Sequence, residues 1–214
     1  MKRLLSYIYP VTKTITSKYS GELEITWYNG KKYLNSQNAN YSYGSLQRIL
    51  KFGLQKIELS NINSILILGM GGGSVIETLR SDFNYTNTIE AVELDPLIIE
   101  IANTEFGIKE NKNLKIHCAD ALDFMAVNTK QFDLIIVDLY IDLSVPDQFL
   151  STIFWNHVLG SKSSKGVILF NASVKDADET KIKTLVNYLK TKVFKVNIYN
   201  KVNNTNTVII ASGL

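Results

Sequence analysis

The stretch "ILILGMGGGS", residues 65–74, decides the fold class of this chain of 214 residues. Four apolar residues run directly into Gly69, Gly71, Gly72 and Gly73, with a single methionine among them. Glycine loses more backbone freedom on folding than any other residue, so a cluster this dense is costly unless the backbone must be bare there. We therefore interpret the stretch as a buried strand, a tight turn and the start of a helix, with a ligand lying against the turn.

Strands and helices alternate from residue 62 onward. Continuous apolar strands separated by helices are typical of a mostly parallel sheet that is covered on both faces. Such sheets bind ligands at the carboxyl ends of their strands, near the point where the strand order reverses. We expect five strands at 63–69, 88–95, 114–120, 132–140 and 165–172, helices at 74–81, 96–104, 121–127, 147–158 and 176–192, and a closing hairpin of strands at 194–200 and 206–212.

Residues 1–60 differ in texture and are rich in Tyr, Ser, Asn and Lys. Apolar and polar residues alternate on both sides of Asn29-Gly30, which is the strongest short-range hairpin signal. Residues 43–55 then carry leucines and isoleucine at helical spacing. The chain is thus expected to have a small N-terminal β-hairpin region with a linking helix (1–60) and a Rossmann-like α/β domain (61–214), with seven strands in its sheet.

Composition excludes several classes of function. The net charge of +3 is too small, and the lysines too scattered, for an extended nucleic-acid surface. The single cysteine, Cys118, rules out an internal disulfide framework, and no Cys/His cluster indicates a metal site. No apolar run approaches the ~20 residues of a membrane helix, and no signal peptide is evident. We expect a cytoplasmic protein with no nucleic-acid or membrane partner.

Acidic residues stand at the carboxyl ends of three of the expected strands. Glu93 lies 24 residues beyond Gly69, the distance at which nucleotide-binding α/β folds place an acid on ribose hydroxyls. Asp120, followed by Ala121, could accept from an adenine amino group or could cap the next helix. Asp138 comes about eight residues before the next helix, so it is no helix cap, and we favour a role in the pocket over one at the solvent.

Together these blocks resemble class I S-adenosylmethionine-dependent methyltransferases, and more closely the polyamine aminopropyltransferases of the spermidine synthase family. The resemblance rests on "ILILGMGGGSVIETL", "IEAVELDPLIIEIA", "LKIHCADALDFM", "FDLIIVDLYIDLSVPDQF" and "KGVILFN". It implies that the glycine turn at Gly69, Gly71 and Gly73 holds the methionine part of the cofactor, that Glu93 holds the ribose, and that Asp120 and Ala121 hold the adenine. It also implies that Asp138 helps to deprotonate the attacking amine.

The departures from the family pattern concern the acceptor. Gly72 stands where the family usually carries an aspartate. The family loop Asp-Ser-x-Asp-Pro here reads Asp138-Leu139-Tyr140-Ile141-Asp142, and its Tyr-His-Glu segment is replaced by "NYSYGS", residues 40–45. A polyamine is a di- or trication whose site needs several carboxylates to offset the desolvation of its ammonium groups.

Aromatic and amide residues stand in place of the missing acids. These residues are Tyr41, Tyr43, Tyr140 and Gln37. They could line a pocket for a less charged acceptor, or they could be half-buried packing residues, which is common for tyrosine. We take Asp138 and Tyr140 as the candidate catalytic residues.

The sequence therefore favours a transferase that binds S-adenosylmethionine, its decarboxylated form or methylthioadenosine, with methyl transfer to a small-molecule acceptor. Aminopropyl transfer and a non-catalytic descendant of the fold are the alternatives. An NAD-dependent oxidoreductase ranks third, because Ser74 stands where the dinucleotide fingerprint needs its last glycine. We further expect a homodimer.

Overall fold

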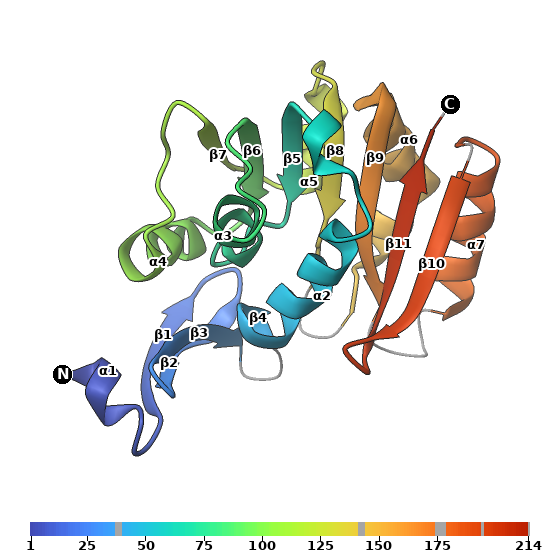
Figure 1. Ribbon diagram of the computed structural model, residues 1–214. Coiled ribbons are helices and arrows are strands. Elements are labelled where there is room, and N and C mark those ends of the chain that lie inside the picture. Colours follow the sequence, from blue (N-terminus) through green and yellow to red (C-terminus); the bar gives the residue numbers. More distant parts are fainter. Residues whose placement is uncertain (37–39, 141–143, 174–178, 194, 214) are drawn as a thin grey trace.

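The computed structural model describes residues 1–36, 40–140, 144–173, 179–193 and 195–213. Two sheets organise these residues, a small antiparallel one at the N-terminus and a seven-stranded one that follows it (Figure 1). No helix among the described residues is long and apolar enough to span a membrane.

The large sheet has the strand order β10-β11-β9-β8-β5-β6-β7. Five of its strands, β5 to β9, are joined by parallel pairing, and β11 pairs antiparallel with both β9 and β10. Because β6 lies on one side of β5 and β8 on the other, the strand order reverses at β5, where the glycine turn begins. The strands are β5 (Ser64–Leu68), β6 (Thr88–Glu93), β7 (Leu114–Cys118), β8 (Phe132–Val137), β9 (Lys162–Ser173), β10 (Lys195–Val202) and β11 (Asn206–Ser212). This confirms the predicted fold class.

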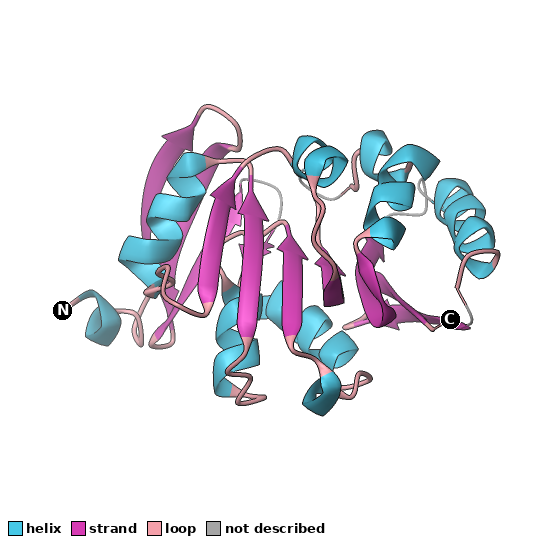
Figure 2. Cartoon of the chain, turned by 90° about the horizontal axis from the view of Figure 1, so that it is seen from above, coloured by secondary structure: helices cyan, strands magenta, loops and turns pink. Residues whose placement is uncertain are grey.

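Helices cover both faces of the large sheet (Figure 2). One core cluster joins residues of α5, α6 and α7 to one face, and a second joins residues of α2 and α3 to the other. The helices are α2 (Gly44–Leu54), α3 (Ser74–Ser81), α4 (Pro96–Phe106), α5 (Ala121–Val127), α6 (Thr152–Gly160) and α7 (Glu179–Lys190), with short 3-10 turns η1 (Leu59–Asn61) and η2 (Asp147–Leu150).

One helix begins later than the sequence suggests. We expected a helix over 147–158, but η2 ends at Leu150 and α6 starts at Thr152. Ser151 separates them, because its extended backbone lets the hydroxyl accept from the N–H of Phe154 and cap α6. A capping side chain thus divides what the apolar pattern presents as one helix.

The N-terminal region is larger than the predicted hairpin. After a single helical turn, α1 (Lys2–Leu5), four strands pair in the order β1-β2-β3-β4. The strands are β1 (Val11–Ser17), β2 (Gly21–Tyr28), β3 (Lys31–Ser36) and β4 (Asn40–Ser42). The hairpin at Asn29-Gly30 is confirmed, and both residues have positive φ, as a type I′ turn requires.

The small sheet packs against helix α4, and the contact places it beside the large sheet. Leu23, Ile25 and Leu34 form a buried cluster with Ile98 and Ile101 of α4. Figure 1 shows the small sheet next to the ends at which the parallel strands finish. The N-terminal region therefore closes over the edge of the large sheet where this fold binds ligands.

Candidate functional site

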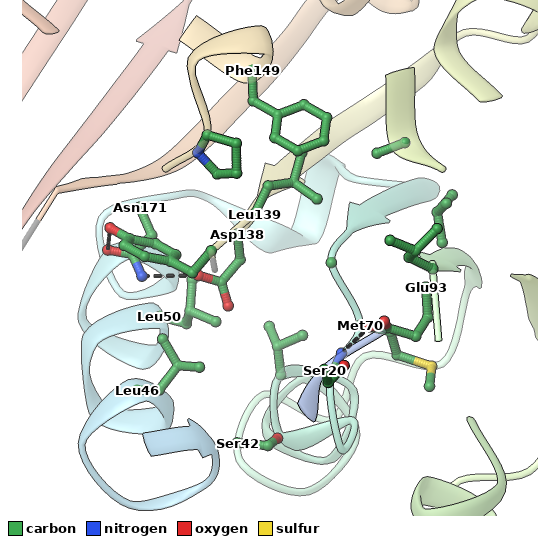
Figure 3. Close-up of a pocket in the computed structure, with 18 of the residues that line it drawn as sticks. Ser20, Ser42, Leu46, Leu50, Met70, Glu93, Asp138, Leu139, Phe149 and Asn171 are labelled. Carbon is green, nitrogen blue, oxygen red and sulfur yellow. Dashed lines mark hydrogen bonds between the residues drawn. The ribbon is translucent and has the colours of Figure 1, made fainter. Parts of the chain in front are cut away.

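A cavity of about 430 Å³ lies at the carboxyl ends of β5, β6, β7 and β8, which is within the usual range for a small-molecule site. The N-terminal sheet and α2 supply the opposite wall, through residues such as Ser20, Ser42, Leu46 and Leu50 (Figure 3). The cavity is therefore enclosed by both parts of the chain.

The glycine turn after β5 forms the floor of the cavity, and two of its glycines are required by the protein itself. A Cβ on Gly69 would lie 2.1 Å from the carbonyl oxygen of Asp138, because the ends of β5 and β8 approach closely there. Gly73 has φ +83° at the start of α3, and its Cβ would lie 2.6 Å from Ile108. Gly69 and Gly71 line the cavity, whereas Gly73 packs behind it.

Gly72 stands at the contact between the glycine turn and the N-terminal sheet. A Cβ here would lie 3.0 Å from the Cβ of Ser42 on β4 and 3.3 Å from Leu34. The space that an aspartate side chain would need is therefore filled by the small sheet. This gives a packing reason for the glycine at the position where the resemblance to the spermidine synthase family implies an aspartate.

Glu93, at the end of β6, is buried and faces the cavity. Its Oε2 accepts from the N–H of Gly71 at 2.9 Å, and its Oε1 accepts from the N–H of Asp95 at 3.1 Å. Burial raises the pKa of this carboxyl, and the two backbone donors partly offset that rise. Glu93 thus fixes the glycine turn and presents its carboxylate oxygens to a ligand in the cavity.

Asp95 caps α4 and also ties the N-terminal sheet to this corner of the site. Its Oδ1 accepts from the N–H of Leu97 at 2.9 Å. Its Oδ2 accepts from the hydroxyls of Ser17, the last residue of β1, and Ser20, in the turn between β1 and β2. Ser20 lines the cavity, so Asp95 anchors the segment that covers the site beside Glu93.

The structure places Asp120 and Ala121 in the cavity wall, at the start of α5. Asp120 Oδ1 accepts from the N–H of Leu122 at 2.7 Å, so the predicted helix cap is present. Because the residue also lines the cavity, capping and a contact with an adenine group are compatible.

Asp138 follows β8 and lies across the cavity from Glu93 (Figure 3). Its backbone N–H donates to the carbonyl of Leu68 at 2.9 Å, which fixes the residue to the end of β5. Removal from bulk water raises the pKa of its carboxyl to about 6; Asn171 opposes this rise, and the charge of Glu93 adds to it. A carboxyl with this pKa is well placed to exchange protons near neutral pH.

Two amide side chains that the sequence analysis did not single out complete this end of the site. Asn171 near the end of β9 donates to Asp138 Oδ1 at 2.8 Å, and Asn206 at the start of β11 donates to Asn171 at 2.8 Å. The hydroxyl of Tyr140 lies 3.3 Å from Asn171 Oδ1. A polar residue inside the apolar strand "KGVILFN" is the sequence signal that could have identified Asn171.

The other residues expected at the acceptor end differ in their placement. Tyr43 is buried, its ring stacks on Phe106 at 4.4 Å, and its hydroxyl lies 3.4 Å from the carbonyl of Gly72, so it is a packing residue. Gln37, Asp142 and the side chain of Tyr41 lie outside the described residues. Within the part of the chain that the structure describes, no group of three His, Cys, Asp or Glu could hold a metal ion.

The comparison with protein families gives one match that covers most of the chain. The family described as "Spermine/spermidine synthase domain" matches residues 47–207, from α2 to the start of β11. The matched segment includes every residue of the glycine turn, Glu93, Asp120, Asp138 and Asn171.

Comparisons with individual proteins point to two kinds of transferase. The chain is 28% identical over 145 residues to the eEF1A lysine and N-terminal methyltransferase of Danio rerio, covering 60% of this chain and 21% of that protein. It is 32% identical over 114 residues to a probable polyamine aminopropyl transferase of Bifidobacterium longum, covering 53% and 25%. The chain thus spans about a quarter or less of the length of these relatives.

A solved structure supports the same fold. Human methyltransferase-like protein 13 in complex with SAH superposes with a TM-score of 0.67 at 23% identity, over 80% of this chain and 83% of that one.

Proposed function

The chain belongs to the spermine/spermidine synthase domain family, and from that premise we propose that it is a transferase that binds S-adenosylmethionine and methylates a small acceptor amine. The observation that carries the proposal is the pair of carboxylates at the two ends of one cavity. Glu93 is held by backbone donors, and Asp138 has a raised pKa and an amide partner. Two acids in such different environments suit two different tasks.

The donor end of the cavity fits a nucleoside with an uncharged sugar. Glu93 would hold the two ribose hydroxyls, because a carboxylate accepts hydrogen bonds from a vicinal diol and carries acceptor capacity beyond its two backbone partners. Asp120 and Ala121 would border the adenine base. Gly69 and Gly71 leave the turn bare for the methionine part of the molecule. The bound SAH in the human neighbour supports this choice of donor. When bound, S-adenosylmethionine supplies an electrophilic carbon attached to a positively charged sulfur.

Asp138 would act on the acceptor. With a pKa of about 6 it is mostly ionised at neutral pH and can take a proton from an ammonium group, which leaves the amine nucleophilic. Leu46, Leu50, Leu139 and Phe149 line the cavity around it and limit the access of water. A less hydrated carboxylate interacts more strongly with a positively charged acceptor.

The described walls favour an acceptor of low charge over a polyamine. Among the described residues that line the cavity, the acids are Glu93, Asp120 and Asp138, and Asp138 is the one at the acceptor end. The wall formed by the N-terminal sheet and α2 presents serine hydroxyls and apolar side chains instead. A second ammonium group would have to be desolvated there at considerable cost.

Aminopropyl transfer is the second candidate, because one of the relatives carries that activity in its name. It would need the decarboxylated donor, whose by-product is methylthioadenosine. A non-catalytic descendant of the fold is the third. We keep the cytoplasm, a small-molecule acceptor and a homodimer as parts of the proposal, the first supported by the lone Cys118.

The by-product of the reaction separates the candidates. The chain is incubated with S-adenosylmethionine or its decarboxylated form and with a monoamine, a diamine or a triamine, and the nucleosides are analysed by mass spectrometry. S-adenosylhomocysteine that accumulates only with an acceptor present supports methyl transfer. Methylthioadenosine formed from the decarboxylated donor with a diamine would replace it with aminopropyl transfer. If neither by-product forms with any of the amines, both transfer reactions are rejected in favour of a protein that has lost turnover.

A further inference from the structure

Asn171 is a fully buried amide placed between polar groups from two other segments of the chain, the loop after β8 and the start of β11. It lies near the end of β9, is 0% exposed, and contacts Asp138 after β8, Tyr140 in the following loop and Asn206 at the start of β11. A buried amide with no charge of its own must have every polar atom satisfied, and here each partner is part of the site.

The partners of Asn171 determine which way its amide points. The amide oxygen has two lone pairs, and it accepts from Asn206 Nδ2 at 2.8 Å and from the Tyr140 hydroxyl at 3.3 Å. The ionised carboxylate of Asp138 can only accept, so it takes the amide nitrogen of Asn171, which donates to Oδ1 at 2.8 Å. Asn206 takes the matching orientation, in which its nitrogen donates to Asn171 and its oxygen accepts from the hydroxyl of Thr205 at 2.7 Å.

These bonds all run in one direction, from Thr205 to Asn206, from Asn206 to Asn171, and from Asn171 to Asp138. We propose that Asn171 is a positioning residue for Asp138. This chain of hydrogen bonds, here called the relay, keeps Oδ1 of Asp138 accepting from Asn171 and leaves Oδ2 to receive the proton from the substrate amine. Figure 3 shows one carboxylate oxygen joined to Asn171 and the other directed into the cavity. The inference rests on the proposed function, because it names how that site prepares its base.

The reverse orientation shows why the relay has a preferred direction. If the amide of Asn171 turned over, its oxygen would face Oδ1 of Asp138. Two acceptor oxygens would then meet, and only a proton on Oδ1 could restore a hydrogen bond between them. Its nitrogen would then meet the donor group of Asn206, which would have to turn as well. Protonation on the buried oxygen therefore costs the reorganisation of several side chains, whereas protonation on the cavity side costs none.

The other groups around Asp138 cannot replace Asn171. Glu93 faces it across the cavity and raises the pKa of its carboxyl, and Tyr140 contributes a neutral phenol. No Lys or Arg is among the described residues that line the cavity. Within this set, the hydrogen bond from Asn171 is the interaction that lowers the pKa of Asp138.

The test is an NMR titration of the free chain, with 13C in the side-chain carboxyl groups of aspartate. The signal of Asp138 is assigned by its loss in Asp138→Asn, and its midpoint is measured between about pH 4 and pH 10. Asn171→Ser is too short to reach Asp138 and should raise the midpoint by about one to two pH units, the equivalent of one hydrogen bond to a charged group. Asn206→Ala frees the amide of Asn171 without touching Asp138 and should raise it by less.

Thr207→Val is the matched control, because Thr207 is the next residue on β11 and its hydroxyl contacts Asn200, outside the relay. It should leave the midpoint unchanged. An unchanged midpoint in Asn171→Ser would overturn the proposal, as would an equal rise in Thr207→Val. If Asn171→Ser does not fold, Asn206→Ala decides in the same way. The titration needs no donor or acceptor, so its result is independent of whether the proposed transfer activity is found.

Discussion

Replacing Glu93 by glutamine should weaken the binding of S-adenosylmethionine without unfolding the protein. Glu93 accepts one backbone hydrogen bond on each oxygen, from Gly71 and from Asp95, and would accept two more from the ribose. The amide retains one acceptor atom, but its NH₂ group cannot accept and carries no charge. Losing charge-assisted hydrogen bonds of this kind costs about 1–3 kcal/mol, which is roughly a 5- to 150-fold increase in Kd.

The assay is calorimetric titration at one pH and salt concentration, with Glu90→Gln as the control. Glu90 lies on the same strand β6, three residues earlier, and pairs with His117 at 2.8 Å and with Lys130 at 2.5 Å, away from the cavity. The control should bind as the unmodified chain does. An unchanged Kd in Glu93→Gln, or an equal loss in Glu90→Gln, would refute the assignment of Glu93 to the ribose.

Four further predictions concern Asp138 and the glycine turn. Asp138→Asn should leave donor binding intact but abolish transfer, and full activity in that variant would remove Asp138 from the chemistry. The pKa of Asp138 in the folded protein, about 6, lies above the ordinary value of 3.8, so the folded state binds this proton more tightly than the unfolded state does. The protein should therefore lose stability as the pH rises from about 4 to about 6. Asp138→Asn should flatten this slope and add up to about 3 kcal/mol to the free energy of unfolding at pH 7, measured by urea denaturation. The rate of transfer should rise with pH through about 6, and in Glu93→Gln this inflection should move to lower pH, since the charge of Glu93 raises the pKa of Asp138. Gly69→Ala should lower the free energy of unfolding by at least about 2 kcal/mol, because its Cβ would meet the carbonyl of Asp138. In the control Gly160→Ala, at the end of α6, the Cβ meets nothing within 4 Å, so this change should be neutral or stabilising by up to about 1 kcal/mol.

The large sheet could be predicted because its signals are local. The apolar run before Gly69, the acid at Glu93 and the acid at Asp138 each mark the end of a strand, and parallel strands bring those ends to one edge. The caps at Asp95 and Asp120 were equally readable, since a capping side chain bonds to a residue two positions away.

The N-terminal sheet could be predicted only in part. The hairpin at Asn29-Gly30 has a turn signal of its own, but β1 reads "VTKTITS" and is mostly exposed, so it lacks the alternation that marks a strand. β4 has three residues, which is too short for any pattern. The reason for Gly72 depends on β4, because Ser42 fills the space beside it. That reason was therefore invisible in the sequence.

The relay behind Asp138 depends on long-range pairing. Asn171 and Asn206 lie 35 residues apart and meet because β11 pairs antiparallel with β9 beside β8. The sequence predicts both strands of the closing hairpin, but no periodicity states which of them borders β9 or in which register. An amide partner for the base is thus a property of the sheet topology.

The most direct test of the central claim is calorimetric titration of the unmodified protein with S-adenosylmethionine, its decarboxylated form and methylthioadenosine in turn. We expect one binding site per chain and tighter binding of S-adenosylmethionine than of the decarboxylated form. Preference for the decarboxylated form would contradict methyl transfer and support aminopropyl transfer. No heat of binding with any of the three would contradict the assignment of the cavity to this class of donor.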